Sequence, residues 1–325
     1  MTSTPDKASR FAPDGSISQP PTRGEVVADR AFRALAFTSG ALVVLLLAYI
    51  LWKIGLQAAP AMERYGLGFL TGAVWDPGRS EFGVLAEIWG TLYSSILALA
   101  LAGFFGVSVA IFLTQDFLDA RLSRVFRTVI EMLAAIPSVV YGLWGIYVVI
   151  PALRPVAAWL HDVFGWFPLF STSLSGPGMA PAVIVLAIMV LPTVAAISQD
   201  AFSLIPYRIK EAAYGLGTTR WEAIMKVMLP TASSGIFASL VLGFGRALGE
   251  TMALAMLIGN SNQISLSLFS PANTLASLLA SQFPEAGGVE VQALMFAAVV
   301  LLLISLAVNI CGTVIMAFSS KQKVS

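Results

Sequence analysis

Charged residues are scarce in this sequence. Asp, Glu, Lys and Arg make up 11% of its 325 residues, whereas soluble globular domains contain about 25%. Hydrophobic residues make up 57%, so we expect most of the chain to face lipid rather than water. The net charge of +1 gives no general attraction for nucleic acid.

Histidine and cysteine are almost absent as well. The single Cys311 excludes an internal disulfide, and with the single His161 it leaves too few ligands for a zinc cluster. The same shortage argues against an intramembrane enzyme, which needs a set of metal-binding residues or a nucleophile with its base. We therefore assign no catalytic residue. No G-x-x-x-x-G-K-[ST] phosphate loop occurs either, so any ATP must be bound by another protein.

Long apolar runs are what the sequence has in abundance. A helix of about 20 apolar residues crosses a hydrocarbon core of about 30 Å, and six such runs occur. They predict an all-α membrane protein with six transmembrane helices. The predicted spans are residues 36–57, 92–114, 128–151, 179–198, 233–259 and 292–318.

The basic residues predict how the chain is threaded. If the N-terminus is cytoplasmic and the spans alternate, fourteen of the nineteen Lys and Arg residues lie in inside segments and four in outside segments. We therefore expect a multi-pass protein of the bacterial inner membrane whose two termini both lie in the cytoplasm. The expected organisation is a largely disordered cytoplasmic segment 1–35, a first helix 36–57, a core 84–318 and a tail 319–325.

The first apolar run also admits another interpretation. A basic leader followed by an apolar stretch and the small residues 58–61 is typical of a cleaved signal peptide. The leader is longer than such peptides have, and the run is long enough to anchor. We therefore favour a membrane span.

The inside loop 199–230 has the pattern of two short helices. Pro206 can open the first, and Gly215 and Gly217 can stop it because glycine accepts the left-handed geometry of a helix end. Thr218 or Thr219 can cap the second, and Glu222 stands three residues after Thr219 as in a capping box. We expect this second helix to end at Pro230. An ordinary self-packed linker and a docking element both fit this pattern.

The loop resembles the EAA signature of binding-protein-dependent ABC importer permeases. Glu211, Ala212 and Ala213 are followed after three residues by Gly217, and after nine more by V-x-L-P, in which Val227 replaces the usual Ile. The resemblance implies a type I importer architecture whose short coupling helix, Glu211 to Gly217, docks on a separate ATPase subunit.

Three further blocks resemble the phosphate-specific transport permeases of the PstC type. They are FGVLAEIWGTL at 82–92, IEMLAAIPSVVYGLWG at 130–145 and GRALGETMA at 245–253. The resemblance implies phosphate import with a related PstA-type permease, a PstB-type ATPase dimer that holds ATP and Mg, and a PstS-type phosphate-binding protein; this chain itself would bind no cofactor. The alternatives are a permease for molybdate or sulfate, and a secondary transporter that works without ATP.

Arg246 and Glu250 are two charges within the fifth predicted span. A charge at the bilayer centre costs about 2.5–3.5 kcal/mol on insertion scales, and on one helix the four-residue spacing would place both side chains on one face. The pair could lock helices in register, or Arg246 could line the substrate path and meet a passing anion. The PstC-type resemblance implies the second role, with Glu250 limiting the affinity.

The third predicted span holds three more candidate structural or pathway residues. Glu131 follows Arg127 by four residues, which favours an ion pair at the start of the helix. Pro137 and Gly142 are expected to kink the span or to admit close packing. Glu87, ahead of the second span, is expected at the outer surface.

Overall fold

The computed structural model of the protein describes residues 22–115 and 117–321. The chain divides into two compact units, residues 1–53 and residues 54–325. Within the described residues, six helical stretches are long and apolar enough to cross a membrane, as predicted. They are Arg23–Tyr65, Leu85–Thr114, Ser138–Phe164, Met179–Ser203, Arg220–Leu248 and Val289–Met316.

Helix α1 (Arg23–Tyr65) is longer than a membrane requires, because its 43 residues span about 65 Å. Its first turn is fixed by Thr22 and Glu25, each of which binds the main-chain N–H of the other, at 2.7 and 3.3 Å. Residues 23–35 of the segment expected to be largely disordered are helical; residues 1–21 lie outside the described residues.

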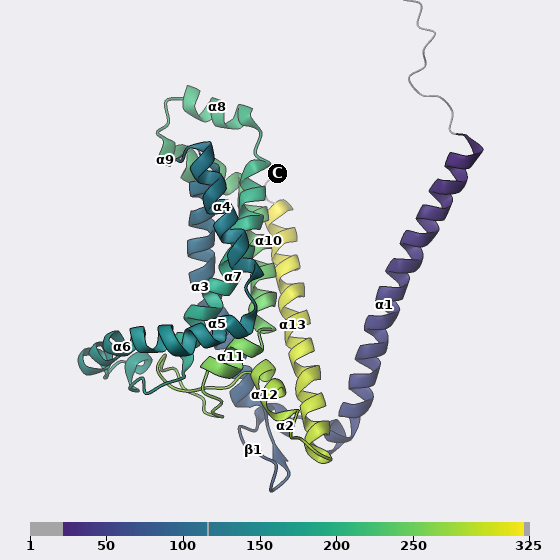
Figure 1. The fold of residues 1–325 in the computed structure, drawn as a ribbon, viewed down its shortest axis with the longest axis vertical. Coiled ribbons are helices and arrows are strands. Elements are labelled where there is room, and N and C mark those ends of the chain that lie inside the picture. The colour runs from purple at the N-terminus through teal and green to yellow at the C-terminus, as the bar shows by residue number, and fades with distance from the viewer. Residues whose placement is uncertain (1–21, 116, 322–325) are drawn as a thin grey trace, which may run out of the picture. The chain divides into compact units, whose positions relative to one another are not determined.

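Four long helices form the bundle of the second unit: α3 (Leu85–Thr114), α7 (Met179–Ser203), α10 (Leu229–Leu248) and α13 (Val289–Lys321) (Figure 1). Small residues let α3 approach α7 closely. A Cβ on Gly106 would come within 3.0 Å of the Val194 side chain. Ser198 of α7 and Ser239 of α10 are both buried and share a hydrogen bond of 3.0 Å, which satisfies two hydroxyl groups inside an apolar core.

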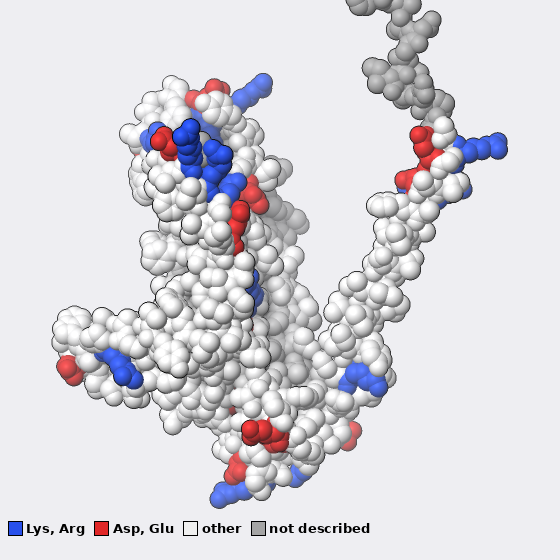
Figure 2. Space-filling view, viewed as in Figure 1, with Lys and Arg blue, Asp and Glu red and all other residues white. Residues whose placement is uncertain are grey.

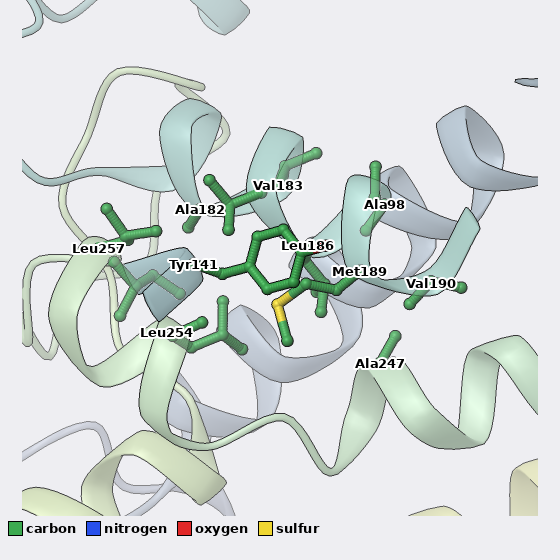
Figure 3. Packing of buried hydrophobic residues seen from close by; sticks show 14 of the residues in the cluster. Ala98, Tyr141, Ala182, Val183, Leu186, Met189, Val190, Ala247, Leu254 and Leu257 are labelled. Atoms are coloured by element: carbon green, nitrogen blue, oxygen red, sulfur yellow. The ribbon is translucent and has the colours of Figure 1, made fainter. Parts of the chain in front are cut away.

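The largest hydrophobic cluster surrounds Tyr141 of α5 (Ser138–Trp144). Figure 3 shows its ring among side chains of α7 and of α11 (Met252–Leu257), with Leu186, Met189 and Leu254 around it. The Tyr141 hydroxyl donates a 2.8 Å hydrogen bond to the carbonyl of Leu133 in α4 (Ala120–Ala135). One buried aromatic residue therefore holds α4, α5, α7 and α11 together.

The third predicted span, 128–151, is wrong as a single helix. Helix α4 ends at Ala135, and α5 starts after Pro137. Proline disfavours helical geometry in the residue before it, and Ile136 is extended. From Ser138 the chain continues through α5, the π-helical turn η2 (Gly145–Val149) and α6 (Ile150–Phe164), and this stretch runs across the bundle rather than along it (Figure 1).

The end of the bundle near β1 is built from short elements and aromatic side chains. Helix α2 (Gly68–Thr71) leads into β1 (Trp75–Asp76) and β2 (Glu81–Phe82), which pair antiparallel with Trp75 opposite Phe82. Phe69 stacks on Phe296 of α13 with 4.3 Å between ring centroids. The short elements at this end include η3 (Pro168–Phe170) and α12 (Leu275–Gln282).

Glu87 lies in the first turn of α3 and is fully buried, which corrects its expected place at the outer surface. Among the described residues, neither of its carboxylate oxygens has a hydrogen-bond partner. The start of α3 is buried because it packs on the chain ahead of α12, where Thr91 Oγ1 accepts a 2.9 Å bond from the Leu275 N–H. One turn of helix therefore combines tight packing with an unpaired polar group.

Candidate substrate path and coupling surface

Arg246 and Glu250 do not share a helix. Helix α10 ends at Leu248, and α11 begins at Met252. Arg246 lies in the last turn of α10, where the negative end of the helix dipole favours a cation. Glu250 lies at the start of α11, and its Oε1 accepts a 3.5 Å bond from the Ala253 N–H. The expected single helical face, and the predicted span 233–259 as one helix, are therefore wrong.

The Arg246 side chain is exposed and only weakly bound. Its Nη1 donates a 3.4 Å hydrogen bond to Thr193 Oγ1 in the middle of α7. Among the residues that the structure describes, no carboxylate lies within 4.0 Å of its guanidinium, and Glu250 is no exception. A guanidinium has five N–H donors in a planar fork that matches oxyanions. The geometry leaves most of these donors for a ligand.

A second polar cluster lies between α4 and α7. Arg127 Nε donates a 3.2 Å hydrogen bond to Oε1 of Gln199, and no ion pair within 4.0 Å joins Arg127 to Glu131 although the structure describes both. The expected ion pair at the start of the helix is therefore wrong. Between the two helices lies an open-sided cavity of about 160 Å³, lined by Arg127, Ile130, Glu131, Ala134, Pro192, Thr193, Ala196 and Gln199.

Charged side chains gather on the face of the bundle that carries α4. Figure 2 shows Lys, Arg, Asp and Glu gathered over α4 and the α8–α9 end, and a small blue patch within the otherwise white middle of the bundle. Thr193 belongs to both polar clusters, because it accepts from Arg246 and also lines the α4–α7 cavity. Thr193 and Gln199 were not predicted from the sequence; the available signal was that Thr193 is a polar residue in the apolar middle of α7 and that Gln199 stands at its more polar end.

Pro137 and Gly142 lie where α5 packs beside the break in the fifth span. Pro137 is the residue before α5 and separates it from α4. Gly142 is buried, and a Cβ there would approach Met256 Sδ of α11 to 2.6 Å. Gly142 therefore positions the segment that follows Glu250, and Pro137 sets where α5 begins. Neither side chain could bind an anion.

The loop 199–230 forms the helix pair that its sequence predicts. Helix α8 (Tyr207–Gly215) follows Pro206, and Gly217 closes the turn with φ of +82°. Helix α9 (Arg220–Ala223) has the predicted capping box of Thr219 and Glu222. The expected end at Pro230 is wrong, because the π-helical turn η4 (Ile224–Met228) continues directly into α10. A proline in the first turn of a helix needs no N–H partner.

Helix α8 lies beyond the end of the bundle next to α9 (Figure 1), and its Ala213 belongs to a buried cluster with Ala110 of α3 and Phe202 of α7. Ala213 is buried, whereas Glu211, Ala212 and Gly217 are exposed. Large apolar side chains around them are also exposed, with Leu216 at 86%. Exposed apolar side chains gathered with charged ones are typical of a protein interaction surface. Besides Leu216, the exposed large apolar side chains of this loop include Leu204, Tyr207, Tyr214 and Trp221.

Solved structures show the same fold. One chain of a bacterial alginate ABC transporter, in complex with an alginate-bound periplasmic protein, aligns with a TM-score of 0.60 at 14% identity, over 88% of this chain and 94% of that chain. A chain of the MetNI methionine ABC transporter in an inward facing conformation aligns with a TM-score of 0.55 at 18% identity, over 73% and 95%. These likenesses confirm the predicted type I ABC importer architecture.

Sequence comparisons give the family. Residues 102–323 match the family described as binding-protein-dependent transport system inner membrane component. The phosphate transport system permease protein PstC of Pasteurella multocida is 40% identical, with 86% of this chain and 89% of that protein covered. Its namesake in Haemophilus influenzae is 42% identical, with 83% and 87% covered. The chain is therefore a multi-pass membrane protein that belongs to the binding-protein-dependent transport permeases and, within them, to the PstC family.

Proposed function

We propose that this chain is the permease subunit of an ATP-driven importer of inorganic phosphate. The observation that carries the proposal is the exposed guanidinium of Arg246 at a break in a membrane-length helix. A fixed cation within the membrane attracts an anion, and its single long bond to Thr193 gives way easily when an oxyanion arrives. The PstC relatives carry phosphate in their names.

The α8–α9 end is the coupling surface in this proposal. The distribution of Lys and Arg supports a cytoplasmic location for this end and for both termini. There α8, with Glu211 and Ala212 on its exposed face, docks on a separate ATPase that binds ATP and Mg. Because η4 continues α9 into α10, a movement of the docked loop passes along one continuous helix to Arg246.

The other proposed partners follow from membership of the PstC family. A related permease of the PstA type covers the exposed face of the bundle, and a PstB-type dimer supplies the hydrolysis. A PstS-type binding protein delivers phosphate at the β1–α12 end. This chain contributes the path and the coupling loop but no cofactor and no catalytic residue.

The proposal is tested by reconstituting the complete complex in proteoliposomes that contain ATP. Uptake of inorganic phosphate should require both ATP and the binding protein, with molybdate and sulfate tested alongside. Preferential uptake of molybdate or sulfate would assign a different oxyanion. Uptake by this chain alone, without an ATPase, would contradict the coupling role and support a secondary transporter.

We expect Gly217→Val to uncouple the transporter. Gly217 has φ of +82°, and a left-handed backbone costs a side-chain-bearing residue roughly 1–2 kcal/mol, so the turn between α8 and α9 should shift. Stimulation of ATP hydrolysis by the binding protein should fall severalfold, and phosphate uptake with it. Gly215→Ala is the matched control, because Gly215 has no neighbour within 4 Å and no positive φ. Equal behaviour of the two variants would contradict the role of the turn.

A further inference from the structure

The path from Arg246 toward the α8–α9 end has a second cation. Arg246 binds Thr193, and Arg127 binds Gln199, so both arginines rest on α7. Thr193 and Gln199 are six residues apart, which is about 9 Å along a helix. Both residues also line the cavity of about 160 Å³ between α4 and α7. The two guanidinium groups are therefore bound at successive positions along the length of α7.

Arg127 retains donors for a ligand in this position. Its hydrogen bond to Gln199 uses only Nε, and Gln199 is 4% exposed, so a buried side chain anchors the guanidinium. Its two outer nitrogens have no hydrogen-bond partner among the described residues. No carboxylate lies within 4.0 Å of it in the described part of the chain. Residues 121–135 of α4 contain no buried side chain, so the site is open to an incoming ion.

Glu131 lines the same cavity and would repel an anion. Arg127 and Glu131 lie on one helix without an ion pair within 4.0 Å, whereas the Arg246–Glu250 pair is divided by the break after α10. A carboxylate in the same cavity weakens anion binding at Arg127 without removing it. Conduction requires sites that an ion can both enter and leave.

We infer that Arg127, anchored by Gln199, is a second oxyanion-binding group that receives phosphate after Arg246 and passes it toward the α8–α9 end. The inference rests on the proposed function, since it concerns the same path. The guanidinium binds the tetrahedral anion through charge-assisted hydrogen bonds, and Thr193 between the two arginines offers a hydroxyl to the ion in transit. No bond is made or broken in the ion.

The test compares Arg127→Gln with Arg127→Lys in the complete reconstituted complex, with inorganic phosphate as the probe. Arg127→Gln should lower the uptake rate roughly tenfold, the effect of losing one charge-assisted hydrogen bond, while ATP hydrolysis remains. Arg127→Lys keeps the charge and should retain at least half of the wild-type rate. Arg121→Gln is the matched control, because Arg121 is exposed on the same helix but lies outside the α4–α7 cavity.

Three results would overturn the inference. Near-normal uptake by Arg127→Gln would show that no ion depends on this group. Equal loss in Arg127→Lys, accompanied by the same loss and poor assembly in Gln199→Leu, would show that Arg127 only ties α4 to α7. An equal defect in Arg121→Gln would show a general effect of removing positive charge from α4.

The proposed function fails separately from this inference. If the wild-type complex carries another oxyanion instead of phosphate, the substrate assignment is wrong. The Arg127 variants are then measured with that anion, and the same ratios decide the role of Arg127. If phosphate uptake is normal in the wild type and in Arg127→Gln, only the second site is lost.

Discussion

Replacing Arg246 with alanine is expected to reduce phosphate uptake by roughly two orders of magnitude. Arg246 supplies the fixed positive charge at the α10–α11 break, and a hydrogen bond to a charged group is worth about 1.5–3 kcal/mol. The change removes an exposed side chain with a single 3.4 Å bond, so the fold should be unaffected. The measurements are phosphate uptake and ATP hydrolysis by the purified complex in proteoliposomes.

Two further variants separate a pathway role from a lock between helices. Arg246→Lys retains the charge and should restore part of the uptake. Arg154→Ala removes an exposed arginine of α6 that also makes one hydrogen bond, 3.1 Å to the Ser175 carbonyl, and should leave uptake near normal. Failure of Arg246→Ala to assemble with its partners would favour the lock. Normal uptake in an assembled Arg246→Ala complex would contradict the pathway role.

Gly90→Ala is expected to prevent accumulation of folded protein. A Cβ on Gly90 would overlap the main-chain carbonyl oxygen of Asn273, which cannot rotate away as the end of a side chain can. Separating α3 from the chain ahead of α12 would also break the bond between Thr91 and the Leu275 N–H. We expect a loss of about 3 kcal/mol or more, the upper range for overpacked cores. The yield of monodisperse protein and its Tm in detergent measure the effect.

Gly103→Ala is the graded control for this steric argument. Gly103 lies in the same helix, but there a Cβ would meet Leu240 Cδ2 at 2.8 Å, the flexible end of a side chain. Leu240 can change rotamer, so we expect a decrease in Tm of only a few degrees. A Gly90→Ala protein as stable as Gly103→Ala would show that the approach of α3 to Asn273 is looser than described.

Local signals explain which parts of the fold could be predicted from the sequence. The capping box of Thr219 and Glu222 and the glycine turn at Gly217 depend on neighbours within a few residues, and both occur as predicted. Pro137 carried an equally local signal, since proline restricts the residue before it. Pro137 was expected to kink a single helix or to admit close packing. Instead α4 ends before Pro137, and α5 starts after it in another direction.

The break between Arg246 and Glu250 could not be read from its own residues. The stretch from Leu248 to Met252 contains no proline, and glycine alone is tolerated within helices. The break depends on packing, because Leu254 and Leu257 of α11 join the cluster around Tyr141. The burial of Glu87 likewise depends on a loop nearly two hundred residues later in the chain, at Asn273 and Leu275.

The interruption of the fifth span affects how long an unassembled copy of this protein should persist in the membrane. A helix end leaves carbonyl and N–H groups without helical partners, and such groups facing hydrocarbon cost several kcal/mol each. The turn from Gly249 to Thr251 is therefore tolerated only where protein or water shields it. A copy without the proposed partner permease would leave this turn facing lipid, and we expect membrane proteases to degrade such a copy faster than the assembled protein.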